Sequence, residues 1–242
     1  MTPAALRTLI AADARVLWRD PLLVWMTAMP IGMAALIRSV VGVVENMLGS
    51  SFDLSPYYPL IMGGYLMTAP GLIGFVVGFL LLDERDTGTL RALRVTPLPT
   101  TQYMAYRIAV PLIAGTLATM IGYRFAGLSP IPTAALAAIA AVASLSAPLL
   151  ALVLAAASPN KVAGFAVVKV LNAVNLLPIA AFFVPPPMQY MAGVLPTYWP
   201  MRALWSVAMG APYWPFLAMG GAVGAVAVLL AARVFHRRLM AS

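Results

Sequence analysis

The chain has 242 residues, of which 62% are hydrophobic and only 9% are charged, and its mean hydropathy is +0.93. A soluble domain carries about 25% charged residues, so this composition excludes a soluble protein and predicts an integral membrane protein. The net charge of +8 comes from basic residues at the ends of apolar runs, which indicates membrane orientation rather than a nucleic-acid partner. The absence of cysteine excludes disulfides, thiolate catalysis and cysteine-ligated metals.

The first segment, residues 3–20, has the pattern of an amphipathic helix on the membrane surface. Arg7, Arg15 and Arg19 fall on one side at helical spacing, and leucine, isoleucine and valine residues fall broadly opposite. Asp13 lies inside the apolar arc, so the pattern is imperfect. The alternative is a short cytoplasmic lead-in to the first span. No cleavable signal peptide is evident in this segment.

Apolar runs long enough to cross a bilayer follow, and they predict an all-α membrane protein with six spans. The spans are expected at about 21–44, 59–82, 103–124, 132–157, 162–184 and 212–232. We expect one membrane domain over residues 1–242, without a separate soluble domain. The proline- and aromatic-rich segment 185–210 predicts short re-entrant or surface-lying helices on the outer face, with an ordinary extracellular loop as the alternative.

The distribution of arginine and lysine predicts the orientation, because basic residues are enriched on the cytoplasmic side. With both termini inside, the charged connector 83–100 is cytoplasmic too. The inner side then holds most of the basic residues: Arg7, Arg15, Arg19, Arg85, Arg91, Arg94, Lys161, Arg233, Arg237 and Arg238. The outer side holds Arg124 and Arg202, with Arg38 near it.

Small residues recur at packing intervals within two spans. Gly71, Gly74 and Gly78 lie on the second span, and Gly220 and Gly224 lie on the last. Such residues let helix backbones approach closely. The spacing predicts a compact bundle, and it leaves open whether the contacts are within one chain or between two chains.

The chain lacks the residues that catalysis or ion coupling within the membrane would use. All seven acids lie outside the expected spans, and the one histidine, His236, lies in the tail. There is no GxxxxGK[ST] phosphate-binding loop. We therefore expect no catalytic, cofactor-binding or metal site in this chain. The missing intramembrane carboxylate also argues against a proton- or sodium-coupled carrier, although backbone carbonyls can bind sodium.

A few polar residues do interrupt the spans. Lys169, Asn172 and Asn175 follow one another at intervals of three on the fifth span. They predict either a polar stripe along a substrate path or hydrogen bonds between helices, with Lys169 reaching toward the membrane surface. Arg107, near the inner end of the third span, is expected to anchor that span at the interface.

The connector after the second span concentrates charge in the sequence LLDERDTGTLRALRVTPLP. Asp83 and Glu84 follow the apolar run directly, and Asp86–Thr89 predicts a turn. The sequence TLRALR predicts a short amphipathic helix that ends before Pro97. Such a charged helix, held between two span ends, favours docking of a soluble partner.

The connector letters ERDTGTL, followed by Leu93 and Thr96–Pro97, resemble the "E-R-[ED]-x-G-T-L … T-P" segment of type-2 ATP-binding-cassette (ABC) export permeases. Segment 195–199, LPTYW, is similar to a "P-x-Y-W" sequence of some small permeases of that family. The resemblance covers essentially the whole chain. It implies a coupling helix in the connector that docks a separate ATPase subunit, which uses ATP and Mg. The residues implied in ATPase coupling are Glu84, Arg85, Asp86, Gly88, Thr89, Leu90, Leu93 and Arg94.

The resemblance also implies partners and a place in the cell. Two permease chains would work together, as a homodimer or a related heterodimer, in the plasma membrane of a bacterium. Glu84 would either contact the ATPase or brace the connector against the N-terminal helix. The chain itself would not be an enzyme.

The exported compound is expected to be small and amphipathic or hydrophobic, because the outer segments are short and the spans carry few charges. The pattern is similar to small drug-export permeases of the fluoroquinolone type. Lipid or polysaccharide export by the same mechanism, an ion-coupled carrier acting without an ATPase, and a non-transporting scaffold are the alternatives.

Overall fold

The computed structural model describes residues 3–49, 52–89 and 99–241, and all regular structure in them is helical. It contains six helices, or pairs of consecutive helices, long and apolar enough to cross a membrane, which confirms the expected fold class. The α-helices are α1 Pro3–Arg19, α2 Pro21–Leu48, α3 Tyr58–Asp86, α5 Thr100–Ala126, α6 Thr133–Ala143, α7 Ser146–Ala157, α8 Lys161–Leu176, α9 Tyr198–Ala208 and α10 Trp214–Ala241. The 3-10 helices are η1 Ser55–Tyr57, η2 Leu177–Phe183 and η3 Met188–Val194.

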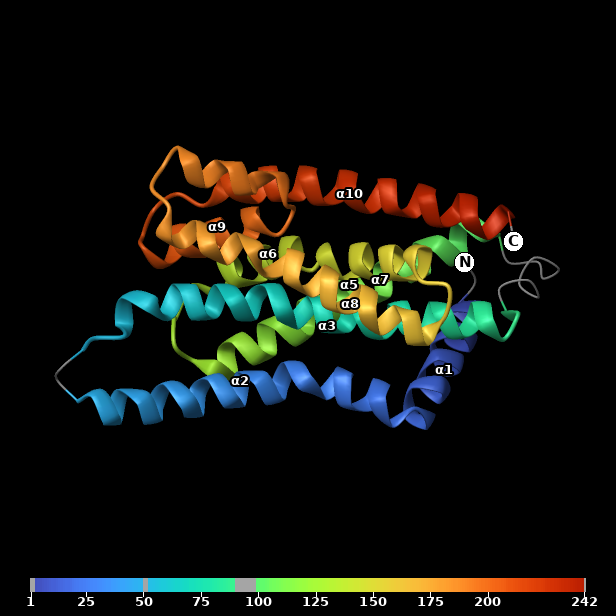
Figure 1. Ribbon diagram of the computed structural model, residues 1–242, viewed down its shortest axis with the longest axis horizontal. Helices are drawn as coiled ribbons and strands as arrows, with labels where there is room; N and C mark the ends of the chain where they lie inside the picture. The colour runs from blue at the N-terminus through green and yellow to red at the C-terminus, as the bar shows by residue number, and fades with distance from the viewer. Residues whose placement is uncertain (1–2, 50–51, 90–98, 242) are drawn as a thin grey trace.

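The long helices run side by side along the molecule and give it two distinct ends (Figure 1). At one end lie both chain termini, with α1 set across the bundle axis and the end of α3 beside it. We call this the termini end. At the opposite end lie α9 and the connection between α2 and α3, and we call this the far end.

The central helix is α3, whose apolar stretch is almost entirely buried and which packs against α2, α5, α7, α8 and α9. Two of its glycines lie very close to α7. A Cβ on Gly74 would lie 2.4 Å from the carbonyl oxygen of Ala147, and one on Gly78 would lie 2.8 Å from a Leu154 methyl group. Small residues are what allow such approach between helices in a membrane, where lipid is as apolar as the side chains.

The glycines of α10 make a similar contact within the same chain. A Cβ on Gly220 would lie 2.8 Å from Val142, and one on Gly224 would lie 2.8 Å from Leu145. The question that the sequence left open is therefore answered for these positions. Both glycine pairs are used to pack this chain's own helices.

Two of the expected spans are not single α-helices, and a proline lies close to each break. The fourth divides into α6 and α7 at residues 144–145, just before Pro148, which has no N–H to donate to the carbonyl of Ser144. The fifth changes from α8 to the 3-10 helix η2 at Leu177, next to Pro178. Both prolines are buried, so neighbouring helices pack against each break.

The segment 185–210 forms two short helices, η3 and α9, rather than an irregular loop. Helix α9 turns Tyr198, Met201, Leu204 and Trp205 into the core, where each is 2% exposed or less. This helix packs against α3, α6 and α10. The far end is therefore closed by a helix that belongs to the hydrophobic core.

Candidate functional site

A cluster of ionised side chains at the termini end joins three helices that are distant in sequence. Its centre is Arg107 of α5, whose side chain is 1% exposed. Arg107 Nη1 donates to Asp13 Oδ2 at 2.7 Å and Nη2 donates to Asp13 Oδ1 at 3.1 Å, which makes a two-point ion pair with α1. Nη2 also donates to Glu84 Oε1 at the end of α3. We call these three residues the Arg107 cluster.

Two tyrosines of α5 complete the hydrogen bonding of the Arg107 cluster. Tyr103 accepts from Arg107 Nε at 3.0 Å and donates its hydroxyl hydrogen to Glu84. Tyr106 donates to Asp13 Oδ2 at 2.6 Å. Because Tyr103 and Tyr106 lie four residues and one residue before Arg107, their rings also flank its guanidinium, with centroids 5.2 and 5.3 Å away. Buried charges are tolerated when they are paired and hydrogen-bonded in this way.

The position of Arg107 differs from the sequence expectation. The expected role was an anchor at the membrane interface, which would leave the guanidinium exposed. The structure instead buries it between two carboxylates. It also explains Asp13, which interrupts the apolar arc of α1 because that arc faces the protein and Asp13 reaches Arg107 from it.

A second ion-pair centre also involves the end of α3 and joins it to the start of α8 and to the corner between α1 and α2. Lys161, at the start of α8, lies 2.9 Å from Asp83 and 3.7 Å from Asp20. Asp20 lies at the corner between α1 and α2, where its Oδ1 accepts from Leu22 N at 3.0 Å and Pro21 opens the next helix. Lys161 thus joins the corner to the end of α3, while Arg107 joins the middle of α1 to it.

Arginines also cover the carboxyl end of α7. Arg85 Nη1 donates to the carbonyl oxygen of Ala155 at 3.2 Å, and Arg238 of α10 donates to that of Ala156. The last carbonyls of a helix lack partners within it and carry partial negative charge, so cations are favoured there. Arg85 therefore points into the bundle in this structure.

The connector motif begins in the last turn of α3, and the described part of it presents small polar groups outward. Asp86, Thr87 and Thr89 are exposed. Gly88 has φ +74°, a conformation that residues with a Cβ rarely adopt, and its N–H donates to Arg85 O at 3.1 Å. Leu90, Leu93, Arg94 and the amphipathic helix expected around them lie outside the described residues.

The sequence matches the family described as "Fluoroquinolones export permease protein Rv2686c-like" over residues 13–232. Two similar proteins are the fluoroquinolones export permease proteins MT2760 and Rv2686c of Mycobacterium tuberculosis, from strains CDC 1551 / Oshkosh and ATCC 25618 / H37Rv. Each is 34% identical over 232 residues, which cover 94% of this chain and 92% of the relative. The chain belongs to this fluoroquinolone export permease family. It is accordingly a multi-pass membrane protein with six apolar membrane-spanning segments.

The three polar residues on α8 of this export permease do not share one environment. Lys169 is exposed on the side of the bundle, Asn172 is partly exposed, and Asn175 is buried. Asn175 Nδ2 donates to the carbonyl oxygen of Met67 at 3.0 Å, and its backbone carbonyl accepts from Thr197. Hydrogen bonding between helices therefore accounts for Asn175. A role of Lys169 and Asn172 in a substrate path stays a prediction.

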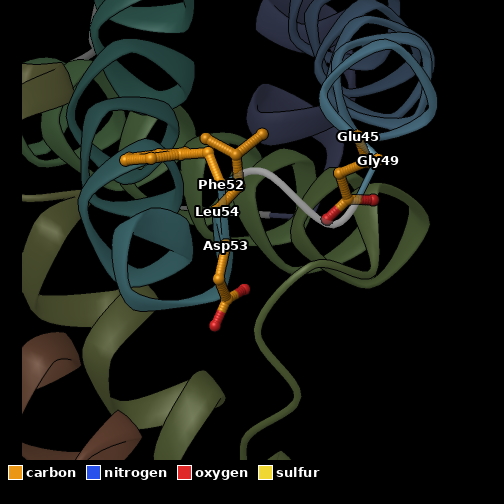
Figure 2. A pocket seen from close by; sticks show the side chains of 5 residues that line it. All are labelled: Glu45, Gly49, Phe52, Asp53 and Leu54. Carbon is orange, nitrogen blue, oxygen red and sulfur yellow. The ribbon is translucent and has the colours of Figure 1, made fainter.

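A hollow of about 220 Å³ at the far end of the permease lies between the end of α2 and η1, and Figure 2 shows its lining. It is lined by Glu45, Gly49, Phe52, Asp53 and Leu54. The carboxylates of Glu45 and Asp53 do not converge on one point in this view. Asp53 accepts from the backbone and hydroxyl of Ser55, which lowers the pKa of its carboxyl group and helps to start η1. Among the residues that the structure describes, no group of three acids and histidines could hold a metal.

Proposed function

We propose that this protein is the membrane subunit of an ABC exporter, which moves a small amphipathic, drug-like compound out of the cell. A separate ATPase subunit would dock on the connector 83–100 and supply the energy from ATP and Mg. Family membership supports the export of a compound, and the names of the relatives support a drug of the fluoroquinolone type. The resemblance of the connector to the ABC permease motif supports the ATPase partner.

The observation that carries the proposal is the pairing of Glu84 with Arg107. Glu84 is the first residue of the connector motif, and through Arg107 it is bound to Asp13 of α1. A displacement of the connector would therefore pull on α1 and α5 through ion pairs that are short and largely shielded from water. Of the two roles expected for Glu84, this geometry favours bracing the connector against the N-terminal helix.

The described end of the connector also suits contact with a partner. The side chains of Asp86, Thr87 and Thr89 are exposed, whereas those of Glu84 and Arg85 are turned toward other helices. We propose that the exposed residues, with the following Leu90 and Leu93, meet the ATPase. Glu84 and Arg85 would then pass the movement into the bundle.

The remaining parts of the proposal concern the assembly and its orientation. Two copies of this chain, or this chain and a related one, would form the translocation path together. The termini end would face the cytoplasm of a bacterial cell, since most basic residues lie toward it. The far end would then face outward.

Reconstitution into lipid vesicles tests the exporter proposal. An ABC ATPase encoded in the same genome should co-purify with the permease, and the pair should transport a fluoroquinolone only with ATP and Mg. Transport by the permease alone under a proton or sodium gradient would contradict the proposal and favour an ion-coupled carrier. Connector-dependent binding of a partner without any transport would favour a scaffold.

Variants at two glycines test the role of the connector. Gly88→Pro should abolish drug-stimulated ATPase activity, because proline cannot adopt φ +74° and removes the N–H that donates to Arg85. Gly127→Pro is the matched control, since Gly127 has φ +71° and donates to Tyr123 at the opposite end. Normal coupling in Gly88→Pro, or equal uncoupling in both folded variants, would contradict the assignment of the connector.

A further inference from the structure

The far end contains a cavity of about 440 Å³ between η2, the proline-rich turn that follows it, and α9. Its lining includes Phe182, Phe183, Gln189, Arg202, Trp205 and Met209. This volume lies within the range of about 300–1,000 Å³ that small-molecule sites occupy. The cavity is separate from the Arg107 cluster, because α9 and the termini lie at opposite ends of the bundle (Figure 1).

Aromatic rings form much of the wall. Phe182 meets Trp205 edge to face, with ring centroids 5.0 Å apart, and it meets Phe183 in the same way at 5.5 Å. Trp205 is 2% exposed and its Nε1 donates to the carbonyl oxygen of Pro59, so its ring is fixed in place. Phe183, in contrast, is 67% exposed and lies at the edge of the cavity. Such a wall favours a flat, apolar ligand that stacks against the rings.

Arg202 is the charged residue in this wall, and its charge is not balanced by the protein. All seven acids of the sequence lie in the described residues, and none of their carboxylates is within 4.0 Å of it. Its guanidinium carbon lies 5.1 Å from the ring centroid of Phe216, which holds the group from one side. Its Nε is buried and has no hydrogen-bond partner in the described structure. Because Arg202 lines the cavity and has no carboxylate partner in the described structure, an anionic ligand in the cavity would balance the charge of its guanidinium.

We propose that this cavity binds an aromatic carboxylate, with the ring against Phe182, Phe183 and Trp205 and the carboxylate on Arg202. An aromatic acid satisfies both the apolar wall and the unpaired guanidinium, whereas a phospholipid head group would leave the aromatic wall uncovered. The inference rests on the proposed export function only for its physiological meaning. In an exporter with the far end outward, this cavity is an outward-facing site for the exported compound.

Direct binding of two matched probes tests the site without relying on transport. The probes are 2-naphthoate and its uncharged analogue 2-naphthamide, measured by equilibrium dialysis against the permease in phosphatidylcholine nanodiscs, with empty nanodiscs as background. The wild-type protein should bind 2-naphthoate about tenfold or more tightly than 2-naphthamide, because charge-assisted hydrogen bonds are the stronger ones. Arg202→Gln should remove that preference, and Arg124→Gln, which removes a positive charge elsewhere at the far end, should keep it.

A second variant keeps the test decisive if Arg202→Gln does not fold. Phe183→Ala changes an exposed ring, so the protein should remain folded, and it should weaken both probes by a similar factor of several-fold. Equal binding of the two probes by wild-type protein, or a preference that survives Arg202→Gln, would overturn the site. Unaltered affinity of Phe183→Ala for both probes would contradict the proposed contact between the ligand ring and the aromatic side chains.

The exporter proposal and the ligand site can be contradicted independently of each other. If the reconstituted transporter does not move fluoroquinolones while the naphthoate preference depends on Arg202, the site stands and the proposed export function is wrong. If transport is observed but the preference does not depend on Arg202, the export function stands and the site is wrong.

Discussion

Arg107 and Arg202 are both shielded arginines, but they lie at opposite ends of the bundle and their surroundings differ. Each nitrogen of the Arg107 guanidinium donates to one of two carboxylates or to a tyrosine. Arg202 has an aromatic ring, no carboxylate within 4.0 Å among the described residues, and an Nε without a partner. A guanidinium whose three nitrogens all donate to protein groups holds helices together. One that lines a cavity and has no carboxylate partner is suited to an anionic ligand, and this difference assigns structural coupling to the termini end and recognition to the far end.

The largest expected effect that tests this comparison is the loss of the Arg107 side chain. Arg107→Met keeps much of the volume but leaves Asp13 and Glu84 shielded from water without their cation. Breaking one partner of such a buried pair costs about 3–5 kcal/mol. We expect a large drop in thermal stability of the detergent-solubilised protein, measured by fluorescence-detected size-exclusion chromatography. Wild-type stability of Arg107→Met would show that the cluster does not hold the helices.

A cycle of Asp13→Asn and Glu84→Gln sharpens the account of the Arg107 cluster. Each single variant leaves Arg107 one ionised partner, whereas the double variant leaves it none. The double variant should therefore be destabilised beyond the sum of the singles, by about 0.5–3 kcal/mol, as expected for residues that share a network. Denaturant unfolding in micelles measures the four proteins. Strict additivity would mean that the two carboxylates do not act through the same guanidinium.

A smaller effect is expected at Lys161, which pairs with Asp20 and Asp83 while remaining about one third exposed. Partly exposed pairs contribute about 0.2–1 kcal/mol and are weakened by salt. Lys161→Met should lower stability slightly at low ionic strength and hardly at all in about 1 M salt. Lys169→Met, an exposed lysine on the same helix, is the control and should show no salt-dependent change. Equal effects of the two variants would remove Lys161 from the coupling network.

The smallest effect on stability is expected for Arg202→Gln at the far end. Because Arg202 has no carboxylate partner in the described structure, its replacement leaves no charge unpaired, and the change should stay within about 0.5 kcal/mol. Thermal unfolding beside Arg107→Met gives the comparison directly. A loss as large as that of Arg107→Met would show that Arg202 is structural, and would break the distinction between the two ends.

The helical bundle could be predicted from the sequence, because the length of an apolar run and the basic residues that flank it are local signals. The runs that predicted six spans correspond to α2, α3, α5, α6 with α7, α8 with η2, and α10. The division of the fourth and fifth spans was not predicted. Pro148 and Pro178 lie at the breaks, but Pro30, Pro70 and Pro111 lie inside continuous helices, so a proline alone does not locate a break.

The partners of Arg107 were harder to predict, because Asp13 lies 94 residues away in sequence. Two local signals pointed to the cluster. Asp13 interrupts an apolar arc, and Tyr103 lies four residues before Arg107, on the same side of the helix. Neither signal shows that Asp13 and Arg107 are partners. The helix ends that meet are determined by the packing of the whole bundle, which cannot be read from local sequence. The cavity beside Arg202 was missed for the same reason, since η2 and α9 become neighbours only in the folded chain.

The two acids at the N-terminal end of the chain have a mechanical consequence. Asp13 and Asp20 are seven residues apart, which is about two helical turns, and each is bound to a cation that also binds the end of α3. A helix attached at one point can rotate about that point, whereas a helix attached at two points cannot rotate independently of α3. Helix α1, the first turn of α2 and the last turn of α3 are therefore held together as one unit directly before the exposed Asp86.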